Sequence, residues 1–239
     1  MNLLEVARKA TKRRIKRLTD TLSKVGLNAV LLFDNDPLAY KLALTHHLDT
    51  VLVTNENIYV VTGPAYALAA GEETPWEAIE SSSADPSSVA DAIAALLPTG
   101  ATIGVNKAWG RTKIGLSNLD LIELLKNRLK ANIIDATSVL ENVFDKPYND
   151  EMVIVEWLPR TASRALEAAV ENIEPGIREA ETAGIVDKTL YEERDHTDGS
   201  RQWLSPGPRA ATPHAKTSTR RIRPRRPGHG RRWPTMARL

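Results

Sequence analysis

The sequence of 239 residues contains no cysteine. This absence excludes disulfides, thiolate zinc sites and cysteine nucleophiles, and it fits a reducing compartment. Aromatic residues make up only 5% of the chain, so a core must consist mainly of leucine, valine, isoleucine and alanine. No apolar run approaches the ~18 residues of a membrane-spanning helix. Residues 1–10 carry charged side chains and lack the apolar centre of a secretion signal, so we expect a cytoplasmic protein.

Acidic residues are absent after Asp198. Residues 199–239 hold eleven lysines and arginines, a formal charge of +11, whereas residues 1–198 hold 21 basic and 30 acidic residues, a formal charge of −9. Carboxylates are the usual ligands of hard cations and are common general bases. Any chemistry that needs a carboxylate must therefore draw it from residues 1–198.

Alternating strand and helix patterns over the first 140 residues predict an α/β domain. Ile15, Leu18 and Leu22 fall at helical spacing, with lysines and arginines around the other face and Val25 ending the stripe. Residues 29–33 are apolar throughout, which predicts a strand of a sheet covered by helices on both faces. Further strands are predicted at 51–53, 58–61, 76–80, 102–105 and 132–135, further helices at 65–70, 87–97 and 116–129, and a turn at 34–37.

A boundary is predicted at Asp145-Lys146-Pro147, after which the pattern becomes helical. Pro159 falls inside the first of these helices, and we expect it to kink or end that helix. A second helix is predicted over 179–191, and the prolines and arginines beyond it are typical of solvated coil. We therefore expect an α/β domain over 1–143, a helical part over 144–222 and a basic disordered tail over 223–239.

Three groups of residues carry side chains capable of chemistry. His214 follows Pro213 and could donate a hydrogen bond to a carbonyl or shuttle a proton, although on spacing alone an exposed loop histidine is the better interpretation. His46 and His47 are adjacent, so their side chains point in different directions and chelate poorly; a polar turn before the strand at 51–53 is favoured. Residues 220–232 carry seven arginines that could neutralise phosphates, or form a disordered segment without a partner.

Familiar local signatures are missing from the sequence. It contains no GxGxxG or GxxxxGK[ST] phosphate-binding loop, no HExxH zinc motif and no GxSxG nucleophile elbow. Local motifs alone therefore indicate only an α/β domain followed by a helical segment.

The order of segments resembles the pita-bread metallopeptidases of the Xaa-Pro group, which include prolidase, aminopeptidase P and their relative creatinase. The segments that carry this resemblance are 17–32, 133–141, 164–169, 174–179 and, most specifically, 205–215. The resemblance implies a creatinase/prolidase-like N-terminal domain with a mixed sheet covered by helices. A truncated pita-bread catalytic domain would follow, reduced mostly to its first helices.

In that family, His214 would match a histidine that contacts the substrate near the scissile bond. The resemblance also implies two divalent ions (Mn, Co or Zn), held by two Asp, one His and two Glu that all follow this histidine. No acidic residue follows His214, so no metal ligand and no cofactor can be assigned to this chain. The composition changes abruptly after Arg223-Pro224, which leads to the hypothesis of a C-terminally truncated or frameshifted gene.

The resemblance implies hydrolysis of X–Pro peptide bonds by full-length relatives, with a proline-containing peptide as substrate, and no activity for this chain as it stands. Its catalytic-domain helices would then expose apolar residues intended for a missing sheet: Leu166, Val170, Ile185 and Val186. One alternative is a non-catalytic binding or dimerisation module that forms a homodimer. Another is nucleic-acid binding through the basic tail. No membrane partner is expected.

Overall fold

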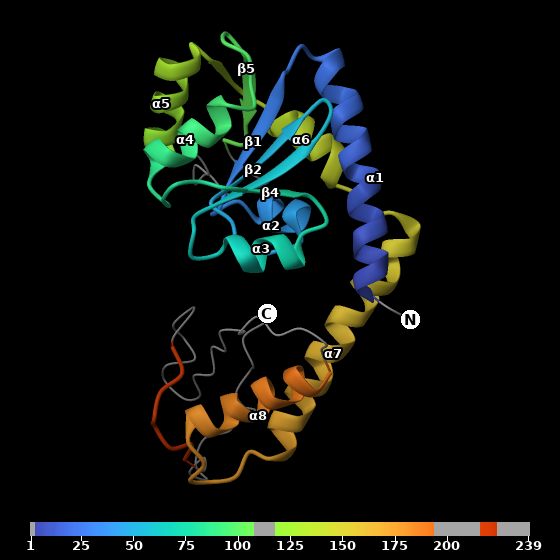
Figure 1. Ribbon diagram of the computed structural model, residues 1–239. Coiled ribbons are helices and arrows are strands. Elements are labelled where there is room, and N and C mark those ends of the chain that lie inside the picture. Colours follow the sequence, from blue (N-terminus) through green and yellow to red (C-terminus); the bar gives the residue numbers. More distant parts are fainter. Residues whose placement is uncertain (1–2, 108–117, 194–215, 224–239) are drawn as a thin grey trace. The chain divides into compact units, whose positions relative to one another are not determined.

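Figure 1 shows the computed structural model, which describes residues 3–107, 118–193 and 216–223. The chain divides into two compact units, Met1–Met152 and Val153–Leu239. The first unit contains all six strands of the described residues, and the second consists, where it is described, of helices and the extended segment 216–223.

A mixed six-stranded sheet forms the centre of the first unit, in the order β4-β3-β2-β1-β5-β6. Strand β1 pairs antiparallel with β2 and parallel with β5, while β2–β3 is antiparallel and β3–β4 and β5–β6 are parallel. In the described part of the chain, β4 and β6 are the outer strands. The strands are β1 (Ala29–Phe33), β2 (Thr50–Thr54), β3 (Ile58–Thr62), β4 (Glu77–Glu80), β5 (Thr102–Val105) and β6 (Asn132–Asp135).

Helices cover both faces of this sheet, as predicted (Figure 1). On one face, side chains of α1 (Leu3–Lys24), α2 (Pro37–Ala43) and α6 (Thr137–Phe144) form a core with alternate residues of β1 and β2. On the other face, α4 (Pro86–Ala94) and α5 (Leu119–Leu129) form a second core. All five residues of β1 are buried. Each leucine buried in this way contributes roughly 1.5–3 kcal/mol to stability.

Two helices of the first unit were not predicted. The turn predicted at 34–37 leads directly into α2: the Asp36 side chain caps the helix by accepting a hydrogen bond from Leu38 N at 2.9 Å, and Pro37 occupies its first turn. Helix α6 follows β6 after a single residue, Ala136. The predicted helix at 65–70 is α3 (Ala67–Glu73), which begins later because residues 64–66 form a turn.

The structure corrects the pattern predicted for the first helix at two positions, Val25 and Arg14. Val25 lies beyond the last helical residue and is 47% exposed, so it is not part of the stripe. Arg14, assigned to the charged face, is only 1% exposed. Its guanidinium is buried because a carboxylate from a distant part of the chain, that of Glu151, neutralises it.

The second unit contains most of α7 (Met152–Glu171) and all of α8 (Glu179–Glu192). Helix α7 continues through Pro159, so of the two predicted effects of this proline, a kink or the end of the helix, the second is wrong. Val186 was predicted to be exposed but is buried, because it packs with Ala165 and Ala169 of α7 and with Leu190. Val170 is 52% exposed, as expected.

The segment 216–223 lies against the start of α8. Ile222 O accepts a hydrogen bond from Gly176 N, and Ile222 N donates to Ile177 O, both at 2.8 Å. Glu179 N donates to Arg220 O at 2.9 Å. Amides at the amino end of α8 therefore find their acceptors in this segment rather than in an external anion.

Candidate functional site

His214, the one residue assigned a catalytic contact from the sequence, lies outside the described residues. The seven arginines of residues 220–232 are only partly covered: Arg220, Arg221 and Arg223 are described and exposed, and the others lie outside the described ranges. Arg221 donates to Gly176 O at 2.6 Å, so one of these guanidinium groups is used within the second unit.

Carboxylates and imidazoles do not converge on a metal site in the described ranges. Within residues 3–107, 118–193 and 216–223, no group of three or more His, Asp or Glu side chains could hold a metal ion. The sequence after Asp198 supplies the nitrogen donors of His214 and His229 but no carboxylate. The dinuclear centre implied by the family needs four carboxylates after His214, so the residues present do not fit it.

The best-defined polar cluster of the first unit lies at the carboxyl ends of β1, β5 and β6. Asn106 Nδ2 donates to Asp36 Oδ2 at 2.7 Å, and both residues are 1% exposed. Thr137 Oγ1 lies 3.2 Å from Asn106 Oδ1 and 2.7 Å from Asp135 Oδ1, and it accepts from Lys107 N at 3.1 Å. These contacts tie the segments that leave three neighbouring strands to one another.

The two carboxyls of this cluster differ in their electrostatics. Burial raises the pKa of Asp36, against the opposing effect of hydrogen bonds from Leu38 N and Asn106. For Asp135, partial burial is outweighed by hydrogen bonds from Thr137 and by the charge of Lys107, so its pKa lies below the usual value.

This cluster occupies the place where open α/β sheets bind ligands. The chain leaves β1 toward β2 on one side, while β5 pairs with β1 on the other, and crevices at such switch points commonly hold substrates. Here Asp36 and Asn106 bond to each other and are closed off from solvent. The arrangement therefore holds the loops in place: Asp36 is buried, and the exposed carboxylate of Asp135 accepts a hydrogen bond from Thr137. The adjacent residues Asp36 and Pro37 are typical of a helix start, and this sequence signal could have located the cluster.

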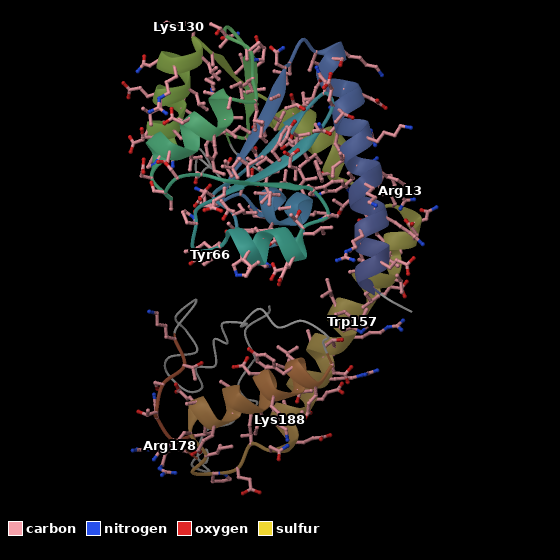
Figure 2. All side chains as sticks on the ribbon, in the orientation of Figure 1. Arg13, Tyr66, Lys130, Trp157, Arg178 and Lys188 are labelled. Atoms are coloured by element: carbon pink, nitrogen blue, oxygen red, sulfur yellow. The ribbon has the colours of Figure 1, made fainter. Side chains whose placement is uncertain are left out.

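His46 and His47 lie in the loop before β2, where a polar turn was favoured. Their rings contact different tyrosines: His46 lies 4.8 Å from Tyr40 and His47 lies 5.4 Å from Tyr66, measured between ring centroids. Figure 2 labels Tyr66 at the start of α3. His47 Nδ1 is also 3.1 Å from Glu73 Oε2. The two imidazoles thus serve separate contacts and do not form a chelate.

Glu73 is the acceptor that organises this loop. Thr45 Oγ1 donates to Glu73 Oε2 at 2.5 Å, and this bond is the main reason that the pKa of Glu73 is lowered, with His47 adding to it. The carboxylate binds both groups, and in the described residues the imidazole of His47 forms no hydrogen bond with the hydroxyl of Thr45. The arrangement lacks the acid–base–nucleophile order of a catalytic triad.

A second cluster lies where the first unit ends. Arg14 forms a bidentate ion pair with Glu151 and donates to Lys146 O at 3.2 Å. Arg13, labelled on α1 in Figure 2, donates to both oxygens of Asp150 at 2.5 and 2.6 Å. Both guanidinium groups lie over the ring of Tyr148, at 4.3 and 4.7 Å from its centroid. The cluster anchors α1 to the turn before α7.

A family model described as Creatinase/Prolidase N-terminal domain matches residues 14–143. The chain belongs to this family. The matched residues include the whole sheet, helices α2 to α5, nearly all of α6 and the second half of α1. A comparison with curated proteins found no match.

Solved structures support the same fold. The chain is similar to the prolidase from Pyrococcus horikoshii OT3, with 21% identity and a TM-score of 0.67 over 88% of this chain and 57% of that one. It is similar to the X-Pro aminopeptidase from Thermotoga maritima MSB8, with 18% identity and a TM-score of 0.69 over 87% of this chain and 57% of that one. The chain therefore spans less than two thirds of the length of these structures. No helix in the described ranges is both long and apolar enough to cross a membrane.

Proposed function

We propose that this polypeptide is a member of the Xaa-Pro peptidase group that does not hydrolyse X–Pro bonds by itself. The match of the creatinase/prolidase N-terminal domain to residues 14–143 supports the relationship to enzymes of this group. The fold of a prolidase and of an X-Pro aminopeptidase supports it as well. The polypeptide contributes the N-terminal domain of such an enzyme.

The set of possible metal ligands supports the second part of the proposal, which is that this polypeptide does not hydrolyse X–Pro bonds by itself. Metal-dependent hydrolysis requires ions held by several side chains, which polarise the carbonyl and supply hydroxide. This polypeptide has no carboxylate after Asp198 that could complete a dinuclear site near His214. His214 remains a proposed substrate-contacting residue whose catalytic partners are not present in this polypeptide.

The decisive experiment is an assay of the full polypeptide with alanyl-proline in the presence of manganese or cobalt ions. We expect no release of proline above the rate with metal alone, and an active prolidase under the same conditions serves as the positive control. The His214→Ala variant should behave like the parent chain. If the parent chain releases proline and His214→Ala does not, the proposal is refuted. Such activity would require a metal site near His214, for which this polypeptide has no carboxylate ligands after Asp198.

Neighbouring exposed apolar residues at the start of α3 favour a second function, assembly into a homodimer. Leu68 on this short helix is 79% exposed, and Tyr66 in the turn before it is 53% exposed; apolar residues that gather on a surface can mark an interaction site. Sedimentation of the full polypeptide should show a dimer that Leu68→Ser weakens. Leu119→Ser, at a 76% exposed position on α5, is the matched control and should leave the dimer intact. A strictly monomeric parent chain would contradict this proposal.

A further inference from the structure

Helix α1 carries two adjacent rows of exposed cations. Arg8, Lys12 and Lys16 form one row and Lys9, Arg13 and Arg17 form the other; all six are exposed. Residues four apart lie on the same side of a helix, and each step advances about 6 Å along its axis. The rows therefore extend together along roughly 14 Å of the helix surface.

Most of this charge has no counterpart within the described residues. Lys9 pairs with Glu5 at 2.8 Å, and Arg13 pairs with Asp150 at 2.5 Å. In the described ranges, the other four cations form no ion pair and no side-chain hydrogen bond: Arg8, Lys12, Lys16 and Arg17. Like charges four residues apart oppose helix formation. The rows thus reduce the stability of α1, and an external polyanion would remove this repulsion.

The same helix face offers little besides charge. The apolar side chains Ile15, Leu18 and Leu22 of α1 are buried against the sheet and are not available to a membrane interior. The first aromatic residue of the sequence is Phe33, so the helix supplies no ring on which an unpaired base could stack. A membrane-surface helix would present apolar residues beside its cations, and a single-strand binder would present aromatic rings.

We propose that these two rows bind the phosphate backbone of double-stranded nucleic acid. Rows of lysine and arginine match closely spaced phosphates and release the counterions condensed on them. The arginines can form paired hydrogen bonds with phosphate oxygens, whereas the lysines act as point charges. Contacts of this kind carry no base information, so binding is independent of sequence. The proposed site uses none of the residues of the basic tail and does not depend on peptidase chemistry.

The test measures binding of the full polypeptide to a fluorescein-labelled 20-base-pair DNA duplex by anisotropy. With four phosphate contacts, affinity should fall on the order of a hundredfold between 50 and 200 mM salt. Neutralising the four unpaired cations by Arg8→Gln, Lys12→Gln, Lys16→Gln and Arg17→Gln should weaken binding at least tenfold. Two duplexes of unrelated sequence should bind equally well.

A charge-matched control removes four exposed lysines from elsewhere in the first unit: Lys107→Gln, Lys126→Gln, Lys130→Gln and Lys146→Gln. It should retain affinity within about twofold. Circular dichroism of the α1 variant should show unchanged helicity and an equal or higher melting temperature, because repulsion has been relieved. Loss of binding with this intact fold supports the site.

Other outcomes would overturn the proposal. Removal of residues 224–239 should leave α1-dependent binding; if that removal abolishes binding while the α1 variant binds normally, the site lies in the tail. Phosphatidylserine vesicles and poly-glutamate serve as competitors. Displacement of the duplex by either at equal charge concentration would show a general response to anions or a lipid site. If the full polypeptide does not bind duplex DNA at 50 mM salt, the proposed nucleic-acid site on α1 is also rejected. This result would not affect the peptidase proposal.

Discussion

Arg14 and Glu151 are 137 residues apart in the sequence and form a bidentate ion pair inside the first unit. Glu151 Oε2 also accepts a hydrogen bond from Tyr148 N at 2.7 Å, so one carboxylate neutralises the arginine and caps the turn before α7. Partial burial raises the pKa of Glu151, but the bonds from Arg14 and Tyr148 outweigh it and lower the pKa overall.

We expect Glu151→Ala to destabilise the first unit by about 3–5 kcal/mol, because it leaves the Arg14 guanidinium buried without a counter-charge. Urea unfolding followed by circular dichroism measures the loss. The double variant Arg14→Met with Glu151→Met should recover most of it, since no buried charge remains. Asp150→Asn removes the partner of exposed Arg13 and serves as the control, with a midpoint close to the parent chain. If Glu151→Ala and Asp150→Asn lower the free energy of unfolding equally, the buried ion pair contributes no more to stability than the exposed one.

The raised pKa of Asp36 predicts a dependence of stability on pH. A carboxyl whose folded pKa is raised contributes stability that is full below its ordinary value of 3.8 and is lost as pH rises through the folded pKa. We therefore expect the parent chain to gain stability relative to Asp36→Asn as pH is lowered from 7 toward 4. Unfolding midpoints at a series of pH values measure this difference. A constant difference across the series would mean that Asp36 titrates normally.

Gly104 of β5 has no room for a side chain. A Cβ added there would lie 2.6 Å from Ala136 Cβ and 3.1 Å from Leu27 Cδ1, so Gly104→Ala must displace a neighbouring segment. We expect a loss of about 1–3 kcal/mol in urea unfolding. Gly71→Ala is the opposite case, since nothing lies within 4 Å of the added atom and the residue is in α3. It should raise stability by about 0.5–1 kcal/mol. Losses of similar size in both variants would contradict this account.

Pro159 lies inside α7 and cannot donate a hydrogen bond to the carbonyl of Val155, which is 46% exposed. Pro159→Ala restores that donor and removes the steric clash of the ring. We expect a net gain of about 1–2 kcal/mol, because the greater freedom of the unfolded chain offsets part of the benefit. Calorimetry would show a higher melting temperature for the second unit. Ser163→Ala, an exposed position on the same helix, is the control and should change it little; a fall in melting temperature for Pro159→Ala would reject this interpretation.

The sheet could be predicted because its strands carry their own signal. The apolar run 29–33, bounded by turn residues, predicts a strand covered on both faces, and β1 is buried at every position. Helix α2 escaped prediction because seven residues cover fewer than two turns, too few to show a periodic pattern. The turn chemistry of Asp36 and Pro37 was identified, but the same two residues also begin a helix.

The buried ion pair could not be predicted from local pattern. Arg14 stands in a run of basic residues, and nothing near it in sequence distinguishes it from exposed Arg13 or Arg17. Its partner is supplied by the fold, across 137 positions. Val186 was misassigned for a related reason: its burial depends on packing between α7 and α8, which periodicity within one helix does not reveal.

The outer strands of the sheet each end in a carboxylate. Glu77 and Glu80 bracket β4, and Asp135 closes β6. A strand from a neighbouring molecule could pair with β4 or β6 only if these carboxylates lost part of their hydration. This desolvation is unfavourable. We therefore expect the first unit to resist fibrillar stacking at neutral pH, and to lose that protection in acid, where the same side chains become neutral.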